Sequence, residues 1–285
     1  MLTVSTAAEL RAELARLRDD ARVLGAGRVA FVPTMGALHA GHLALVAEAR
    51  RHADVVAMSI FVNPLQFGPN EDFTRYPRDE DGDAAKAREA GVDLLFTPGV
   101  QDVYPREPRV RVVPGSMADR WEGAVRPGHF AGVLTVVAKL FHLVQPDVAV
   151  FGQKDAQQAA LVRAMVDDLN LPLDLVVAPT VREADGLAMS SRNARLSPEA
   201  RAAAPVLARA LGWAEALAQL GATAEALAEA VRRIIEDEPL ARESRVDVVD
   251  EAFAPATGPL RGRVGIMVSA RFGDVLLIDQ REIEP

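Results

Sequence analysis

The sequence of 285 residues contains no cysteine. Disulfide bonds, a thiolate nucleophile and a zinc–thiolate site are therefore excluded. The absence of disulfides agrees with a cytoplasmic location, although it fits other compartments as well.

Long apolar runs are also absent. The longest one, residues 130–144, is interrupted by Lys139 and His142 and is shorter than the ~18 apolar residues that span a bilayer. Residues 1–11 contain Glu9 and no apolar core of a signal peptide. We therefore expect a cytoplasmic protein with no membrane partner.

Positive charge is in short supply. The chain has 32 Lys and Arg against 40 Asp and Glu, which gives a net charge of −8. An acidic chain repels a phosphate backbone, so we expect no nucleic-acid partner. A local basic pocket for a single nucleotide remains compatible with this charge.

The first part of the chain alternates apolar, strand-like runs with segments that have helical spacing. This alternation predicts an α/β fold with a doubly wound, mainly parallel sheet. Ligands in such sheets bind outside the carboxyl ends of the strands. We expect strands at 28–32 (ending at Pro33), 54–62, 93–96, 109–113, 147–151 and 173–177, and helices at 6–19, 42–52, 79–90, 128–144 and from about 156 to 169.

The character of the chain changes after residue 181. Alanine-rich helices are expected at 198–220 and 224–236, followed by short strands at 245–249, 264–270 and 274–278. A hairpin loop at 271–273 would join the last two strands. The sequence therefore predicts one domain at 1–180 and a smaller C-terminal α+β domain at 181–285.

The segment PTMGALHAGH (33–42) leads from a predicted strand through a glycine-containing turn into a helix. Gly36 and Gly41 let the backbone approach a ligand closely, and a helix N-terminus offers N–H groups to phosphate. His39 and His42 could stabilise charge on that phosphate. Two surface histidines at a helix cap are the alternative, and the spacing differs from the helical zinc motif.

Two further segments follow predicted strands. In FVNPLQF (61–67), the amide of Gln66 suits a hydroxy acid, although a solvated loop glutamine would look the same. In FGQKDAQQ (151–158), Lys154 opposes the dipole at a helix start and is better explained by a facing phosphate. Gln158 lies four residues later, on the same helix face.

Two more polar segments complete the set. VREADGLAMSSRN (181–193) places hydroxyls beside a guanidinium, which suits a phosphate clamp or a polar linker. In RPGHF (126–130), His129 precedes an apolar helix, and we expect it to cap or pack rather than to catalyse.

These segments, extended to RPGHFAGVLTVVAKLF (126–141), resemble in collinear order the pantoate–β-alanine ligase family. The resemblance implies a Rossmann-like domain of the nucleotidyltransferase type, a smaller C-terminal lid domain and a cytoplasmic homodimer. It also implies that Mg²⁺-ATP activates pantoate as pantoyl adenylate, which β-alanine converts to pantothenate with release of AMP.

The resemblance also implies roles for individual residues. His42 is the expected proton donor, and Gln66 is expected to contact pantoate and β-alanine, Gln158 pantoate. The expected catalytic residues are His42, His39, Lys154, Ser191 and Arg192. The expected ATP-binding residues are Met35, Gly36, Ala37, Leu38, His39, Ala40, Gly41, His42, Gly152, Gln153, Lys154, Asp155, Val181, Met189, Ser190, Ser191 and Arg192.

Other interpretations remain open at this point. A nucleotidyltransferase that stops after transferring AMP or CMP would want more cations at its acceptor site than Gln66 and Gln158 supply. A non-catalytic nucleotide-binding module would need fewer charged groups. The Mg²⁺ ligands are not identified, because Asp81 and Asp83 fit a solvated helix start equally well. The segment 66–77 or the C-terminal domain is expected to exclude water.

Overall fold

The computed structural model describes residues 1–23, 25, 27–68, 73–74 and 76–284. The chain divides into two compact units, one of residues 1–152 and 158–178 and the other of residues 153–157 and 179–285. Among the described residues, no helix is long and apolar enough to cross a membrane.

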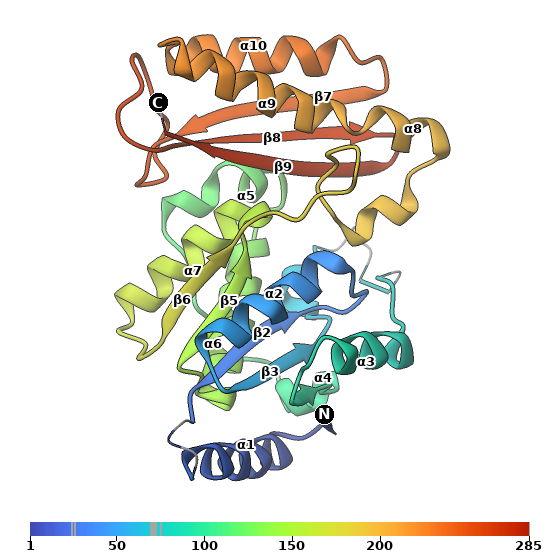
Figure 1. The fold of residues 1–285 in the computed structure, drawn as a ribbon, viewed down its shortest axis with the longest axis vertical. Coiled ribbons are helices and arrows are strands. Elements are labelled where there is room, and N and C mark those ends of the chain that lie inside the picture. Colours follow the sequence, from blue (N-terminus) through green and yellow to red (C-terminus); the bar gives the residue numbers. More distant parts are fainter. Residues whose placement is uncertain (24, 26, 69–72, 75, 285) are drawn as a thin grey trace. The chain divides into compact units, whose positions relative to one another are not determined.

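The first unit is built on a parallel sheet, which has six strands within the described residues, in the order β1-β4-β3-β2-β5-β6 (Figure 1). Its strands are β1 (Leu2–Val4), β2 (Val29–Thr34), β3 (Val55–Ile60), β4 (Leu94–Phe96), β5 (Val148–Gly152) and β6 (Asp174–Ala178). Its longer helices are α1 (Ala7–Arg22), α2 (Ala40–His52), α3 (Glu80–Glu89), α6 (His129–Val144) and α7 (Ala156–Asp168). Shorter turns of helix are η1 (Pro64–Gln66), α4 (Val100–Val103), η2 (Ser116–Asp119) and α5 (Trp121–Val125).

Alternation along the strands explains why helices cover both faces of this sheet. Phe31 and Ala57 point into one core with α1, α6 and α7, whereas Val32 and Met58 point into a second core with α2 and α3. Side chains of successive strand residues point to opposite faces, so a strand buried on both sides is apolar throughout. The predicted doubly wound α/β sheet is confirmed.

The chain first forms the edge strand β1, continues at β2 in the middle of the sheet, proceeds outward through β3 to β4 beside β1, and then crosses to β5 on the other side of β2. The strand order therefore reverses between β2 and β5, and the carboxyl ends of these two strands are Thr34 and Gly152. Such reversals are where α/β sheets bind ligands. The segment 33–42 leaves the sheet at this position.

The second unit places helices against a small antiparallel sheet. The sheet, which has three strands among the described residues, consists of β7 (Ala241–Val249), β8 (Val264–Phe272) and β9 (Val275–Ile283). The helices α9 (Val206–Gln219) and α10 (Ala224–Glu236) lie along this sheet (Figure 1). Its buried side chains alternate along β8 and share a core with both helices. This unit also contains η3 (Gln153–Asp155), η4 (Ser191–Arg195) and α8 (Pro198–Ala203). The predicted α+β character of this region is confirmed.

Several sequence predictions need correction. The strand expected at 109–113 is absent from the structure, where Val110 and Val113 are 85% and 75% exposed and pair with no strand. The helix expected at 198–220 is split into α8 and α9 because Pro205 cannot continue a helix. The strand β1 was not predicted, because three half-exposed residues at a sheet edge show no periodicity.

Two boundaries also differ from those predicted. Strand β2 continues through Pro33 to Thr34, and its pairing with β5 covers only Ala30 and Phe31. The Thr34 carbonyl accepts from Phe61 on the β3 side, so Pro33 faces the other side, where its missing N–H costs no ladder hydrogen bond. The hairpin between β8 and β9 turns at Gly273 and Asp274, later than 271–273, because Phe272 still pairs with Val275.

Candidate active site

The loop after β2 has an unusual backbone. Gly36 and Ala37 adopt consecutive positive φ angles of 84° and 52°. A Cβ on Gly36 would lie 2.9 Å from Asp83 Oδ2 and 3.0 Å from Ile60 Cγ2, so only glycine fits there. Leu38, the next residue after this turn, is buried in the sheet core and anchors the loop.

Both histidines of the loop are oriented by the backbone at the start of α2. This helix begins at Ala40, two residues before the predicted start, so that His39 is its N-cap. The Nδ1 atom of His39 accepts the Gly41 N–H at 3.1 Å, and Nδ1 of His42 accepts the His39 N–H at 3.3 Å. Their ring centroids are 4.1 Å apart.

This arrangement defines the tautomer of both rings. A ring nitrogen that accepts a backbone N–H carries no proton, so each neutral imidazole has its proton on Nε2. His39 and His42 are thus two neighbouring Nε2–H donors beside the N-terminus of α2. Such a set of donors can bind and stabilise an anionic oxygen.

Asp83, on α3, binds the backbone of the same loop, and the sequence did not predict this contact. Its Oδ2 accepts the Ala37 N–H and its Oδ1 the Leu38 N–H, both at 2.7 Å. The residue is only 1% exposed, and Lys86 Nζ lies 3.7 Å from Oδ1. A single Asp in an acidic helix start carries no sequence signal that distinguishes it from its neighbours.

Gln66, expected to bind the organic acid, is buried at the end of η1 and held on both sides. Its Oε1 accepts from Asn63 Nδ2 at 3.1 Å, and its Nε2 lies 3.1 Å from Met35 Sδ. Asn63 is itself fixed, because its Oδ1 accepts the hydroxyl of Tyr104 at 3.0 Å. The structure therefore brings the predicted acid-binding amide into contact with the predicted nucleotide loop.

Asn63 and Tyr104 were not singled out from the sequence. Asn63 also donates to the Gly132 carbonyl at 3.1 Å, and a Cβ on Gly132 would collide with the backbone of Leu65. Burial raises the pKa of the Tyr104 phenol, so its hydroxyl stays protonated as a donor. Asn63 is visible in the motif 61–67, but Tyr104, 41 residues later, lies outside every motif.

His129 lies at the first position of α6 and is 7% exposed. Its Nδ1 lies 2.8 Å from the Gln66 carbonyl, which can only accept, so Nδ1 carries the proton. Its Nε2 then accepts from Arg126 Nη1 at 3.0 Å, while Arg126 Nη2 donates to the same carbonyl at 3.3 Å. The buried, packed environment agrees with the structural role expected for His129, and it adds a purpose, which is to hold the main chain of Gln66.

Gln158 and Gly152 complete the predicted site residues of the first unit. Gln158 is half-buried in the first turn of α7, and Gly152 is the last residue of β5. Within the described part of the chain, no polar contact of the Gln158 side chain sharpens its predicted role, and Gly152 has no side chain.

In the second unit, two predicted nucleotide residues lie side by side. The Met189 N–H donates to the Val181 carbonyl at 3.0 Å, and Arg182 forms a β-bridge with Ala188. Residues 181–189 thus form a hairpin. Arg182, which forms this bridge, donates to Asp279 of β9 through both terminal guanidinium nitrogens at 2.7 and 3.0 Å.

The segment after this hairpin folds into η4. Ser190 caps it by accepting the Arg192 N–H at 3.2 Å, and the guanidinium of Arg192 lies 3.5 Å from the Leu276 carbonyl. Asn193 donates to Glu183 at 3.0 Å, and Glu183 is paired with Arg201 at 2.6 Å. Arg201 also lowers the pKa of Asp185 through a hydrogen bond. A network of charges therefore sets the position of residues 190–192.

Lys154 lies in η3, also in the second unit, between Gln153 and Asp155. Its side chain is 18% exposed, and its Nζ is 3.7 Å from Asp155 Oδ1. A lysine that is this deeply enclosed, with so long a contact to its carboxylate, is well suited to hold an anionic ligand.

Comparisons with known proteins agree on one family. Residues 2–282 match the family model described as pantoate-beta-alanine ligase. The chain is 53% identical over 291 residues to pantothenate synthetase of Thermus thermophilus, with 100% of both proteins covered. It is 53% identical over 278 residues to pantothenate synthetase of Acidothermus cellulolyticus, covering 96% of this chain and 89% of that protein.

Solved structures give the same result. The crystal structure of pantothenate synthetase from Thermus thermophilus superposes with a TM-score of 0.93 at 50% identity and covers all of both chains. Pantoate-beta-alanine ligase from Francisella tularensis, complexed with β,γ ATP and β-alanine, has a TM-score of 0.78 at 31% identity and covers 99% of this chain and 97% of its own.

Proposed function

We propose a two-step route through a pantoyl adenylate for this chain, which belongs to the pantoate–β-alanine ligase family. The chain is an ATP-dependent ligase that condenses pantoate with β-alanine. The family membership inferred from five motifs is confirmed, and a transferase that stops after nucleotidyl transfer is no longer needed as an explanation.

In the first step, a carboxylate oxygen of pantoate attacks the α-phosphorus of ATP. The bond from that phosphorus to the bridging oxygen breaks, and pyrophosphate leaves with the electron pair. In the second step, the neutral amine of β-alanine attacks the acyl carbon, the bond to AMP breaks, and the nitrogen loses a proton. Neither step needs a protein nucleophile, so positioning and charge stabilisation carry the catalysis.

The single observation that carries this proposal is the pair of histidines at the start of α2. Each Nδ1 is occupied by a backbone N–H, so both rings offer Nε2–H as a donor. We assign residues 35–42 to ATP and His42 to proton donation toward the phosphate oxygens, with His39 beside it. Donors placed in advance where charge develops cost no reorganisation during the reaction.

We assign Gln66 to pantoate and β-alanine, and Gln158 to pantoate. Because Oε1 of Gln66 accepts from Asn63, its N–H₂ group is turned toward Met35, and so toward the nucleotide loop. In that orientation Gln66 can donate to a carboxylate or hydroxyl oxygen of an acid bound beside the loop.

We assign to the same nucleotide the predicted residues of the second unit. Lys154 and Arg192 would supply cations, Ser190 and Ser191 hydroxyls, and Val181 and Met189 their neighbouring backbone groups. The residues concerned are Gln153, Lys154, Asp155, Val181, Met189, Ser190, Ser191 and Arg192, and we assign Gly152 of the first unit to the nucleotide as well.

We propose that Mg²⁺ arrives as part of the substrate Mg²⁺-ATP. Among the described residues, no group of three or more His, Asp or Glu side chains could hold a metal ion. Mg²⁺ commonly keeps several waters and binds through the phosphates of its nucleotide, which agrees with a protein that lacks a dedicated site in its described part.

We also propose a cytoplasmic location, a homodimer, a lid function of residues 181–285, and closure of the segment 66–77. Part of that segment, residues 69–72 and 75, lies outside the described residues. In a dimer, the second subunit could cover the exposed side chains of Val110 and Val113. Light scattering on the wild type and on Val110→Asp tests it, since a monomeric wild type would exclude the dimer.

An isotope experiment tests the adenylate. The protein is mixed with ATP, Mg²⁺, β-alanine and pantoate labelled with ¹⁸O in its carboxylate, and AMP is analysed by mass spectrometry. An acyl adenylate transfers one ¹⁸O to AMP, because the acyl carbon–oxygen bond breaks in the second step. AMP without ¹⁸O, or ADP in its place, would exclude this route.

A further inference from the structure

Asp83 connects the third helix to the loop that carries both histidines. Its two carboxylate oxygens accept the N–H groups of two consecutive residues, Ala37 and Leu38, each at 2.7 Å. The residue belongs to α3, 46 and 45 positions away from these two residues in the sequence, and is 1% exposed. Charge-assisted hydrogen bonds of this length are the strong ones, and burial strengthens them further.

These two bonds hold a backbone that would not adopt its conformation unaided. Gly36 and Ala37 both have positive φ, and an alanine with a φ of 52° is in a region that residues with a Cβ rarely adopt. Strained backbone of this kind persists only where its surroundings determine it, and it concentrates at functional sites. Asp83 binds the N–H of the strained residue itself and that of its successor.

The same bonds determine where α2 begins and how its first residues face. Leu38 is followed directly by His39, the N-cap, whose main-chain N–H donates to His42 Nδ1. A shift of the peptide at 37–38 would move this N–H and, with it, both imidazoles. Neutralising the carboxylate would weaken one hydrogen bond and leave the other N–H facing a second donor.

We infer that Asp83 is a positioning residue for adenylation: it sets the strained loop so that the Nε2–H groups of His39 and His42 face the phosphates. This inference rests on the function proposed above. With this role, Asp83 is not a Mg²⁺ ligand, which was one possibility left open by the sequence. Mg²⁺ keeps most of its waters, whereas this carboxylate is almost completely enclosed and both its oxygens are engaged.

The test compares Asp83→Asn with Glu80→Gln, which neutralises an exposed carboxylate on the same helix. The readout is pantoate-dependent exchange of pyrophosphate into ATP, measured across Mg²⁺ and pantoate concentrations. We expect Asp83→Asn to lower the maximal rate about 10- to 100-fold, as misplaced catalytic groups do, with the half-saturating Mg²⁺ concentration unchanged. Glu80→Gln should exchange at the wild-type rate.

A positioning role and a metal-ligand role give different outcomes. An Asp83→Asn rate equal to that of Glu80→Gln would overturn the inference. So would a loss of activity that excess Mg²⁺ restores, because that behaviour belongs to a metal ligand. A similar loss in both variants would point to helix charge rather than to the loop and would also overturn it.

Amide hydrogen exchange gives a second measurement that needs no activity. In the wild type, the amides of Ala37 and Leu38 should exchange slowly although they lie in a loop, and in Asp83→Asn faster exchange should be confined to residues 36–39. Rapid exchange of both amides in the wild type would overturn the inference, even if the variant failed to fold. The wild type could instead show protected amides but no pantoate-dependent pyrophosphate exchange. In that case the adenylate proposal has failed, whereas the proposed fixing of the loop by Asp83 has not.

Discussion

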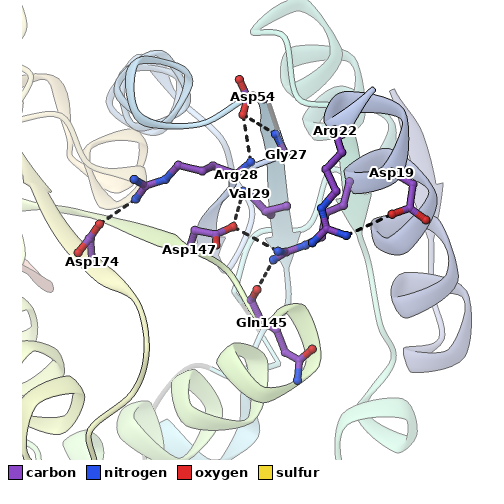
Figure 2. Close-up of polar contacts among 10 residues, drawn as sticks. Asp19, Arg22, Gly27, Arg28, Val29, Asp54, Gln145, Asp147 and Asp174 are labelled. Carbon is purple, nitrogen blue, oxygen red and sulfur yellow. Dashed lines mark hydrogen bonds and ion pairs between the residues drawn. The ribbon is translucent and has the colours of Figure 1, made fainter. Parts of the chain in front are cut away.

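The parallel sheet has an amino edge, where its strands begin, and a carboxyl edge, where they end. At both, aspartate side chains accept hydrogen bonds from backbone N–H groups, but for different purposes. At the amino ends of the strands, Asp147 accepts the Val29 N–H at 2.7 Å and Asp54 accepts the N–H groups of Gly27 and Arg28 (Figure 2). At the carboxyl ends, Asp83 accepts two N–H groups of the histidine loop.

The surroundings of these carboxylates distinguish the two edges. The Asp147 side chain is 38% exposed and also forms an ion pair with Arg18. Nearby, Arg28 forms an exposed ion pair with Asp174 at 2.8 Å (Figure 2). Asp83 is buried and holds residues with positive φ. The amino edge therefore completes the hydrogen bonding of ordinary strands, whereas the carboxyl edge holds a loop with two consecutive positive φ angles, to which we assign ATP binding.

The largest effect is expected at the carboxyl edge, at His42. His42→Asn keeps an acceptor near the position of Nδ1 for the His39 N–H but removes the Nε2–H donor, and it should slow adenylation by ~10²-fold or more. His42→Gln places an amide near the position of Nε2 and should retain more activity. His52→Ala, at the exposed far end of the same helix, is the matched control. Equal rates for His42→Asn and the wild type would remove His42 from the mechanism.

The next effect concerns Gln66. Tyr104→Phe removes the hydroxyl that fixes Asn63, and Asn63 in turn fixes the amide of Gln66. We expect the KM for pantoate to rise about 3- to 10-fold, since one neutral hydrogen bond contributes about 0.5–1.5 kcal/mol, with a smaller change in the KM for ATP. Initial-rate kinetics with each substrate varied would show this, and an effect limited to ATP would contradict the assignment of Gln66.

At the amino edge, the same kind of substitution should affect stability alone. Asp147→Asn weakens the bond to Val29 and should lower the free energy of unfolding by about 1 kcal/mol. Asp174→Asn removes only an exposed ion pair and should cost about 0.5 kcal/mol or less. Urea titrations would measure both, and neither variant should change the rate of pantothenate formation. A lower rate of pantothenate formation in either variant, with unchanged stability, would contradict a purely structural role of the amino edge.

The smallest effect is a pH dependence at Asp54. The N–H groups of Gly27 and Arg28 lower the pKa of this carboxyl in the folded chain. Because the folded pKa lies below the unfolded value, the stabilisation is present above the ordinary pKa of about 3.9 and is lost as the pH falls through the lowered value. Asp54→Asn should therefore flatten the acid-side loss of stability in urea titrations from pH 5 to 2. An unchanged slope would exclude this contribution.

The candidate site residues at the carboxyl edge were easier to predict from the sequence than the residues that hold them in position. His39, His42, Gln66 and Lys154 follow strands in recognisable motifs, and strand alternation was enough to predict the parallel sheet. Asp83, Tyr104 and Asp279 act across 41 to 97 positions in the sequence and carry no local pattern. Their roles depend on tertiary contacts that no periodicity encodes.

The errors have the same origin. The valines at 109–113 have a strand-like composition, but without a neighbouring strand they form no sheet in the structure. Pro33 looked like the end of a strand, yet the side it faces has no ladder bond to lose. Local composition predicts which structures are permitted, and neighbours supplied by the fold decide which of them forms.

One comparison tests the distinction between the edges most directly: pantoate-dependent pyrophosphate exchange and urea stability, measured together for Asp83→Asn and Asp147→Asn. We expect Asp83→Asn to lose exchange by about tenfold or more because the loop is misplaced, beyond any change in stability. We expect Asp147→Asn to keep full exchange with a lower free energy of unfolding. Equal losses of exchange in the two variants, or full exchange in Asp83→Asn, would contradict the positioning role of Asp83.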